Sequence, residues 1–200
     1  MPIATAKEFR KKFLEAFDEC CDEARRHSFG EAWKNWTAFM TGKNTKIDSW
    51  DRRSVLPTVA EKCGLQFERE FMRLDLVLYK RGGCPLAVAI EHENDPGGLK
   101  TELDKLFLVR CGLKVLITYA WNGGKGFVKA KNDLEDLIRE YYKSYASNLP
   151  PEPPETEYLF LLGNQETPKS IAWYYLSFDV KRGLEKNSFQ ISRRKSGGTP

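Results

Sequence analysis

The stretch that decides the fold spans residues 74–94 and reads LDLVLYKRGGCPLAVAIEHEN. Two apolar, β-prone runs, Leu74–Tyr79 and Leu86–Ile90, flank a turn at Lys80–Gly83 that Pro85 delimits. Apolar runs of this length on either side of a glycine-rich turn are typical of neighbouring antiparallel strands. The stretch therefore predicts a β-hairpin whose second strand is buried and ends in Glu-His-Glu-Asn.

Acidic side chains occupy matching positions on the two predicted strands. Successive side chains of a strand point to opposite faces, so Glu91 and Glu93 share a face, about 6–7 Å apart, and His92 lies on the other face. Folding the hairpin near Gly83 brings Asp75 opposite position 91. We therefore expect the carboxylates of Asp75, Glu91 and Glu93 to converge at one end of the sheet.

Converging carboxylates suit a divalent metal ion. Like charges this close raise one another's pKa unless a cation intervenes, and Mg²⁺ commonly uses one or two carboxylates with water and substrate phosphate. A metal held there could activate water and neutralise charge on a phosphodiester. The alternative is an ordinary solvated strand end, where Glu-x-Glu pairs are common. The apolar strand before the pair and the aspartate in register favour the metal site.

Helices are expected before the hairpin. Residues 5–26 carry apolar side chains at helical spacing, and Ser28 is placed to cap a second helix containing Trp33, Trp36 and Met40. At this spacing the two tryptophans indicate core packing rather than base stacking. Both helices form a predicted N-terminal helical region.

A third helix and a strand lead into the hairpin. The helix fits residues 50–63, with Ser49 as N-cap and Gly64 just past its end, and Pro57 either kinks it or marks its start. Alternating residues in Leu65–Phe71 then predict a strand.

Beyond the hairpin, strand and helix patterns alternate. A loop at Asp95–Gly98 precedes a helix over Leu99–Val109 and a buried strand over Leu113–Ala120, which predicts a right-handed crossover. A helix over 133–146 follows. After a stiff, proline-rich connector at 150–154, a late hairpin is expected from the apolar segments Tyr158–Leu162 and Ile171–Val180.

The chain divides into three predicted parts. Residues 1–48 form the helical region packed on the core, 49–189 form the core with its late hairpin, and 190–200 are expected to be a disordered basic tail. That tail either contacts phosphate or is simply solvated.

The order helix–strand–strand–strand–helix–strand from about Ser49 to Ala120, with its acidic residues, resembles a known superfamily. Asp75 on one strand and Glu91 on the next are similar to the PD-(D/E)xK phosphodiesterases, whose shared core is αβββαβ. Glu93 stands where that pattern has lysine, as in the ExE variant of some restriction enzymes. The resemblance implies an α/β restriction-endonuclease-like core with a mixed central sheet, and nucleic-acid hydrolysis with Mg²⁺ or Mn²⁺.

The missing lysine has candidate replacements on the following helix. These are Lys100 and Lys105; Lys105 borders the apolar face, and a solvated surface lysine is the alternative for both. Glu70 and Glu61 are further acids near the predicted site, with ordinary surface positions as the alternative. Glu102 borders the apolar stripe of the helix and is expected merely to flank it.

A second group of residues is a candidate nucleic-acid contact. Trp121 follows a core strand and opens a glycine-rich loop, with Lys125 and Lys129 close in sequence. Aromatic and basic side chains together suit a nucleic-acid backbone and unpaired bases. We expect this loop to lie near DNA.

Composition narrows the class of protein. A length of 200 residues suits one α/β domain. The net charge of +4 is compatible with binding to nucleic acid. No apolar run is long enough to cross a bilayer, and the charges within 7–12 exclude a secretory signal. The five cysteines are scattered without a CxxC pair, and there are only two histidines, which argues against a zinc site and indicates reduced thiols in a cytoplasmic protein.

These patterns predict a Mg²⁺-dependent endodeoxyribonuclease. Its partner would be DNA, and a homodimer is the arrangement that many enzymes of the superfamily adopt. One alternative is a catalytically decayed module that binds nucleic acid or protein, which the missing lysine favours. Another is a metal-dependent hydrolase of a nucleotide or other small phosphate ester.

Overall fold

The computed structural model describes residues 5–27, 36–42, 53–82, 86–120, 126–148, 151–167, 170–184 and 188–193. The helices are α1 (Ala6–His27), α3 (Trp36–Thr41), α4 (Val55–Cys63), α5 (Leu99–Leu108) and α6 (Phe127–Asn148). Two short 3-10 turns are η1 (Phe71–Arg73) and η2 (Pro96–Gly98). The strands are β1 (Gln66–Arg69), β2 (Leu76–Tyr79), β3 (Leu86–Glu93), β4 (Leu113–Ala120), β5 (Glu157–Thr167), β6 (Ser170–Asp179) and β7 (Gln190–Arg193).

All seven strands form one mixed sheet in sequence order. The first three strands are antiparallel, β3, β4 and β5 are parallel, and β5, β6 and β7 are again antiparallel. This confirms the α/β class, the mixed sheet and the late hairpin. The order over residues 55–120 is α4, β1, β2, β3, α5, β4, as expected.

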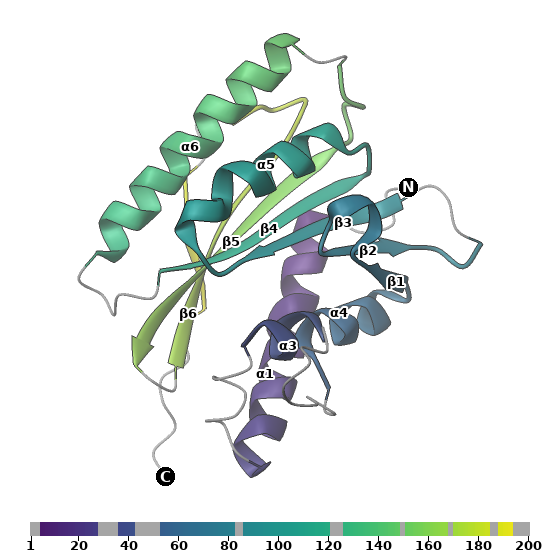
Figure 1. Ribbon diagram of the computed structural model, residues 1–200, viewed down its shortest axis with the longest axis vertical. Helices are drawn as coiled ribbons and strands as arrows, with labels where there is room; N and C mark the ends of the chain where they lie inside the picture. Colours follow the sequence, from purple (N-terminus) through teal and green to yellow (C-terminus); the bar gives the residue numbers. More distant parts are fainter. Residues whose placement is uncertain are drawn as a thin grey trace.

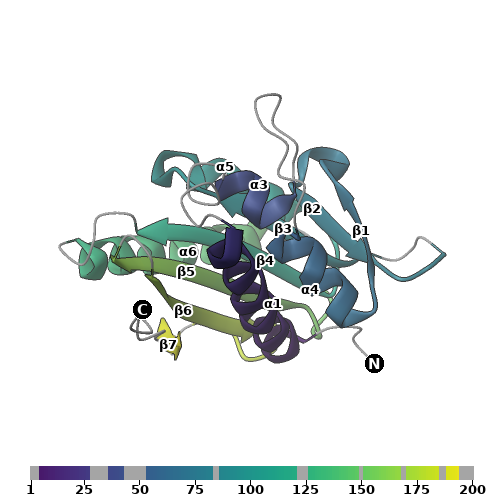
Figure 2. The same ribbon diagram turned by 90° about the horizontal axis from the view of Figure 1, so that it is seen from below.

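Helices cover both faces of the sheet. Figure 1 shows α5 and α6 on one face, and Figure 2 shows α1, α3 and α4 against the other. Strand β3 serves both layers because its side chains alternate: Val88 and Ile90 pack toward α1 and α4, whereas Ala89 packs toward α5. Consecutive residues of β3 therefore lie in different chemical surroundings, which matters for the acidic residues at its end.

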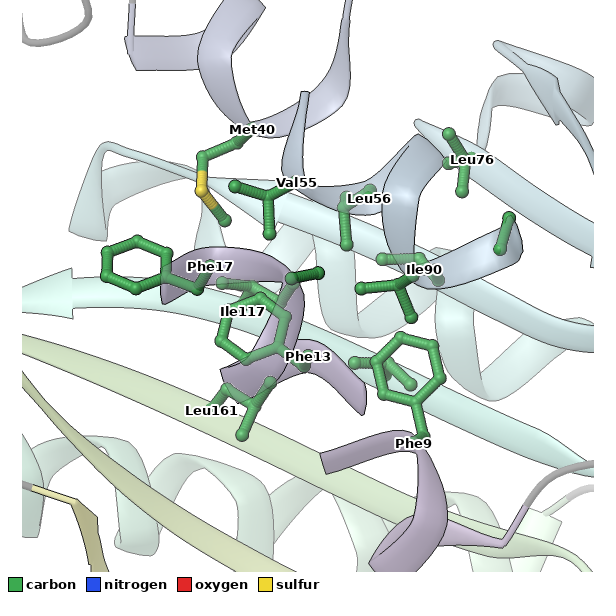
Figure 3. Close-up of a cluster of buried hydrophobic side chains, with 14 of the residues drawn as sticks. Phe9, Phe13, Phe17, Met40, Val55, Leu56, Leu76, Ile90, Ile117 and Leu161 are labelled. Atoms are coloured by element: carbon green, nitrogen blue, oxygen red, sulfur yellow. The ribbon is translucent and has the colours of Figure 1, made fainter. Parts of the chain in front are cut away.

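A stripe of aromatic side chains packs helix α1 against the sheet. Phe9, Phe13 and Phe17 recur every four residues, and all three are buried against the sheet (Figure 3). The rings of Phe13 and Phe17 lie edge-on to Trp173, at centroid distances of 4.8 and 5.2 Å. Truncating such a ring typically costs about 3–5 kcal/mol, so the N-terminal helix is part of the main core.

Several helix boundaries differ from those expected. Helix α4 begins at Val55 rather than at residue 50, and Pro57 lies in its first turn, where a proline removes no needed N–H donor. Gly64 ends this helix in the left-handed conformation, as predicted. Helix α6 begins at Phe127 rather than near residue 133. The expected caps Ser28 and Ser49 lie outside the described residues.

The two ends of the sheet also differ from expectation. The first strand stops at Arg69 and is followed by a 3-10 turn, where a continuous strand to Phe71 was predicted. The prediction that the whole of 190–200 is disordered was wrong, because Gln190–Arg193 pairs with β6 as an edge strand. Residues 194–200 are outside the described ranges. None of the described helices has the length and apolar character needed to span a membrane.

Candidate active site

The β2–β3 hairpin brings Asp75 beside Glu91. Leu76 pairs with Ile90, so continuing the antiparallel register by one pair places Asp75 opposite Glu91 on the face that carries α5. Oδ2 of Asp75 accepts a hydrogen bond from the backbone N–H of His92 at 2.8 Å. The backbone register predicted from the hairpin is therefore present, and Asp75 is fixed at the start of its strand.

Glu91 is fully buried, and its carboxylate oxygens make no hydrogen bond of good geometry in the described residues, although Glu102 and Lys105 lie beside them. Burial, a side-chain hydrogen bond with Glu102 and the charges of Asp75 and Glu102 together raise the pKa of Glu91 to about 10, and Lys105 opposes the change. Burying an unsatisfied polar group costs free energy. Burial therefore favours the protonated form of Glu91 even with the ammonium of Lys105 nearby.

Helix α5 places two charged side chains beside Asp75 and Glu91, the acid pair of the site. Nζ of Lys105 lies 3.6 Å from Oε1 of Glu91 and 2.5 Å from Oε2 of Glu102. Burial alone would lower the pKa of Lys105, but its hydrogen bond to Glu102 and the nearby carboxylates outweigh this and raise it. The lysine is therefore a stable ammonium, which the Glu102 carboxylate holds beside the carboxyl group of Glu91.

The placement of these two residues follows from the apolar stripe of α5. Leu99, Leu103 and Leu106 are buried in the layer between α5 and the sheet. Glu102 and Lys105 each precede one of these leucines and are separated by one helical turn, so both border the buried stripe on the same side. The leucines of α5 thus pack against the sheet, and Lys105 at the edge of the same stripe contacts Glu91.

Glu93 makes different contacts from Glu91. Its Oε1 accepts a hydrogen bond from the backbone N–H of Asp95 at 2.6 Å. Gly98 leaves room for this carboxylate, because a Cβ at that position would lie only 2.7 Å from Cδ of Glu93. Glu93 therefore fixes the loop that precedes α5. Its negative charge near the N-terminus of that helix also stabilises the helix. Its assignment to a metal ion stays a prediction.

The arrangement of side chains limits how a metal could bind. Within the described ranges, no group of three or more acidic, histidine or cysteine side chains is arranged to hold a metal ion as it stands. Asp75 and Glu91 are nonetheless two neighbouring carboxylates, and Mg²⁺ commonly takes only one or two from the protein. Within the described ranges, Asp75 and Glu91 are therefore the two carboxylates that could bind an ion together with water.

His92 faces away from this group, as predicted. Its Nε2 lies 2.9 Å from the hydroxyl of Tyr119 on the α1 side of the sheet. Burial lowers the pKa of His92 to about 3. The histidine is therefore neutral and structural, and it offers no general base to the acidic face.

Other predicted accessory residues lie on the surface. Glu61 is exposed on α4 and pairs with Arg53 at 3.3 Å. Lys129 is exposed on α6 and pairs with Asp133 at 2.5 Å. Lys100 and Glu70 are also exposed. Trp121 and Lys125, the other two residues of the predicted nucleic-acid contact, lie outside the described residues.

Comparison with protein-family models, with curated proteins and with solved structures gives no match. A functional assignment therefore depends on the residues themselves.

Sequence reasoning underestimated Glu102. It was expected only to flank the apolar stripe, yet it holds Lys105 beside Glu91. The signal was present as an acid and a base one helical turn apart, on a helix that directly follows the acidic strand.

Proposed function

We propose that this chain is a Mg²⁺- or Mn²⁺-dependent nuclease that hydrolyses phosphodiester bonds, most suitably those of DNA. The observation that supports this best is Glu91, a fully buried carboxylate with unsatisfied oxygens beside Asp75, Glu102 and Lys105. Acids whose pKa is shifted strongly by burial and by a specific charged partner cluster at functional sites.

In this proposal Asp75 and Glu91 hold the cation. A divalent ion bound there would supply charge neutralisation at the phosphodiester and a lower pKa for an attacking water. The backbone N–H of His92 keeps Asp75 oriented toward the site. A bound cation would favour the ionised form of Glu91, whose pKa is raised in its absence.

Lys105 would act on the substrate. Its ammonium has three N–H donors and a side chain about one quarter exposed, so it can reach outward from the acid pair. Donation to a non-bridging phosphate oxygen, or to the attacking water, would stabilise charge that develops in the transition state. Glu102 is a positioning residue in this proposal, because it holds Nζ of Lys105 at 2.5 Å.

Lys105 is a candidate for the lysine that the PD-(D/E)xK pattern has and that this chain lacks at position 93. Glu93 occupies the lysine position of the PD-(D/E)xK pattern, and a lysine from α5 reaches the same acid from the neighbouring element. Together with the αβββαβ order of residues 55–120, this supports a restriction-endonuclease-like core with a relocated lysine.

Cleavage of supercoiled plasmid tests the proposal. Purified protein should nick or linearise DNA with Mg²⁺ or Mn²⁺ and should stop when EDTA is added. Asp75→Asn and Glu91→Gln should abolish the activity, while Glu61→Gln, an exposed acid on α4, should leave it unchanged. Cleavage that survives chelation would contradict the metal mechanism.

The second candidate function is a nucleic-acid-binding or protein-binding module with a decayed site. The complete burial of Glu91 favours it, because a side chain without exposed surface is not open to substrate. Calorimetry separates the two candidates: DNA affinity without any Mg²⁺ or Mn²⁺ binding supports the module.

A further inference from the structure

Three acidic groups act on the ammonium of Lys105. Nζ lies 2.5 Å from Oε2 of Glu102 and 3.6 Å from Oε1 of Glu91. The charge of Asp75 also contributes to the raised pKa of this lysine. Asp75 and Glu91 belong to the β2–β3 hairpin and Glu102 to α5, so the ammonium lies where an acid from the helix meets the acid pair of the sheet.

The position of this ammonium is one that a divalent ion would also take. Mg²⁺ binds carboxylate oxygens at about 2.0–2.1 Å, and the oxygens nearest to Nζ belong to the carboxyl groups of Glu91 and Glu102. An ammonium and a metal ion cannot both occupy that position. Within the described ranges no three acidic side chains are arranged for a metal as they stand, because Glu102 is turned to Lys105.

Lys105 is also the most exposed member of this contact. Its side chain is 26% exposed, whereas that of Glu102 is 12% exposed and that of Glu91 is fully buried. A lysine has a long, flexible stem that can carry its ammonium out to water. Movement of Lys105 therefore frees an oxygen of Glu102 and uncovers Glu91 together.

We propose that Lys105 is the resident cation of this site, which a divalent metal ion displaces, and that Glu102 then turns from the lysine to the metal as a third ligand beside Asp75 and Glu91. The inference rests on the proposed function and adds a ligand and a mode of regulation to it. The displaced ammonium is free to meet the phosphodiester, so metal binding and release of Lys105 are one event.

Charge and tethering set the terms of the competition. A divalent ion has twice the charge of an ammonium, so at equal distance each carboxylate attracts it about twice as strongly. The ammonium is part of the chain and loses little translational freedom when it binds, whereas the metal ion must be captured from solution. Lys105 therefore holds the site until the metal concentration passes a threshold.

The affinity for Mn²⁺, measured without DNA by the electron paramagnetic resonance of the free ion, tests the exchange. Removing the competing ammonium in Lys105→Met should tighten Mn²⁺ binding by on the order of tenfold. Lys100→Met removes the same charge from an exposed position of α5 and should leave the Kd unchanged. An unchanged or weaker affinity in Lys105→Met would overturn the proposal.

A double variant separates ligation by Glu102 from its hold on Lys105. In the Lys105→Met background there is no ammonium to position, so a ligand role alone makes Glu102→Gln weaken Mn²⁺ binding, by about tenfold or more. Glu61→Gln in the same background, which removes an exposed acid of α4, should have no effect. Equal affinities with and without Glu102 would overturn its role as a ligand.

Lysine labelling follows the exchange in the unaltered chain and does not depend on how any variant folds. An amine-acetylating reagent, read out by mass spectrometry, should modify Lys105 several-fold faster when Mn²⁺ is added, since its ammonium leaves the carboxylates. Lys100 should react at the same rate with and without the ion. Mn²⁺ binding that leaves the labelling of Lys105 unchanged would overturn the displacement.

Plasmid cleavage by the unaltered protein scores the nuclease separately. Cleavage with unchanged Mn²⁺ affinity in Lys105→Met would overturn the exchange and uphold the nuclease. Tighter binding in Lys105→Met, without cleavage by the unaltered protein, would uphold the exchange and reject the nuclease. Absence of Mn²⁺ binding from every variant would overturn both.

Discussion

Lys105 of α5 lies 3.6 Å from Glu91 of β3, a carboxylate that is fully buried. The contact links β3 to α5, the helix that connects the parallel strands β3 and β4. Among the ion-pair contacts of the described residues, it is the one that reaches Glu91. Glu102 completes the contact by holding the ammonium at 2.5 Å.

Replacing Lys105 by methionine should slow DNA cleavage by about 100-fold or more, the usual effect of removing one donor to transition-state charge. Lys100→Met, an exposed lysine of the same helix, is the matched control and should cleave normally. Initial rates on plasmid DNA with Mg²⁺ make the comparison. Equal rates for the two variants would exclude Lys105 from the reaction.

Glu91→Gln should make the metal-free protein more stable at alkaline pH. Because the pKa of Glu91 is raised to about 10 in the folded protein, the folded state holds a proton that the unfolded state has released above pH 4.5, so stability falls as pH rises between these values. Glutamine has no such proton to lose. Thermal unfolding in EDTA at pH 6 and pH 9 measures the stability of Glu91→Gln relative to the unaltered protein. The advantage of the variant should be larger at pH 9 than at pH 6. An advantage that does not change with pH would mean that Glu91 titrates normally.

Divalent metal should reverse this order of stability. A ligand at a hundredfold excess over its Kd adds about 2.7 kcal/mol, or on the order of 5–10 °C for a chain of this size. Unaltered protein should gain this stability with Mn²⁺, and Glu91→Gln should not. A gain of the same size in both proteins would place the ion elsewhere.

His92 should make the protein sensitive to acid. Its pKa is about 3 when folded and near 6.5 when unfolded, so the unfolded state binds the extra proton first and stability falls as pH drops from 6.5 toward 3. The slope is at most about 1.4 kcal/mol per pH unit. His92→Gln should flatten this part of the profile in chemical unfolding; an unchanged slope would mean that the histidine is already charged in the fold.

Glu93→Gln should affect cleavage far less than Glu91→Gln. Glutamine keeps an oxygen that can accept from the backbone N–H of Asp95, so the loss should be about tenfold at most, the value of one hydrogen bond. An effect as large as that of Glu91→Gln would support the prediction that Glu93 also holds the metal ion.

The part of the site carried by the hairpin was predictable. Side chains alternate along a strand, so a turn near Gly83 and an apolar run were enough to place Asp75 opposite Glu91, and the observed register agrees. The direction of Glu93 was also given by alternation, but its carboxylate is held by a loop N–H. Which contact a side chain finally makes depends on the loop beyond it, which strand periodicity does not describe.

The contribution of α5 was harder to foresee. Its leucine stripe predicted the helix, but the rotation of that helix on the sheet decides whether Glu102 and Lys105 meet Glu91 or solvent. That rotation is set by packing of Leu103 against the sheet face, a tertiary effect. The edge strand at Gln190 was missed for a related reason, since its pairing with β6 comes from the partner strand and not from its own polar sequence.

Crystals soaked in Mn²⁺ and measured for anomalous scattering test the central claim most directly. We expect one anomalous peak within coordination distance of the carboxylates of Asp75 and Glu91, and its loss in crystals of Glu91→Gln. A soaked crystal with no peak at these residues, or with a peak that persists in Glu91→Gln, would contradict a metal site at the end of β3.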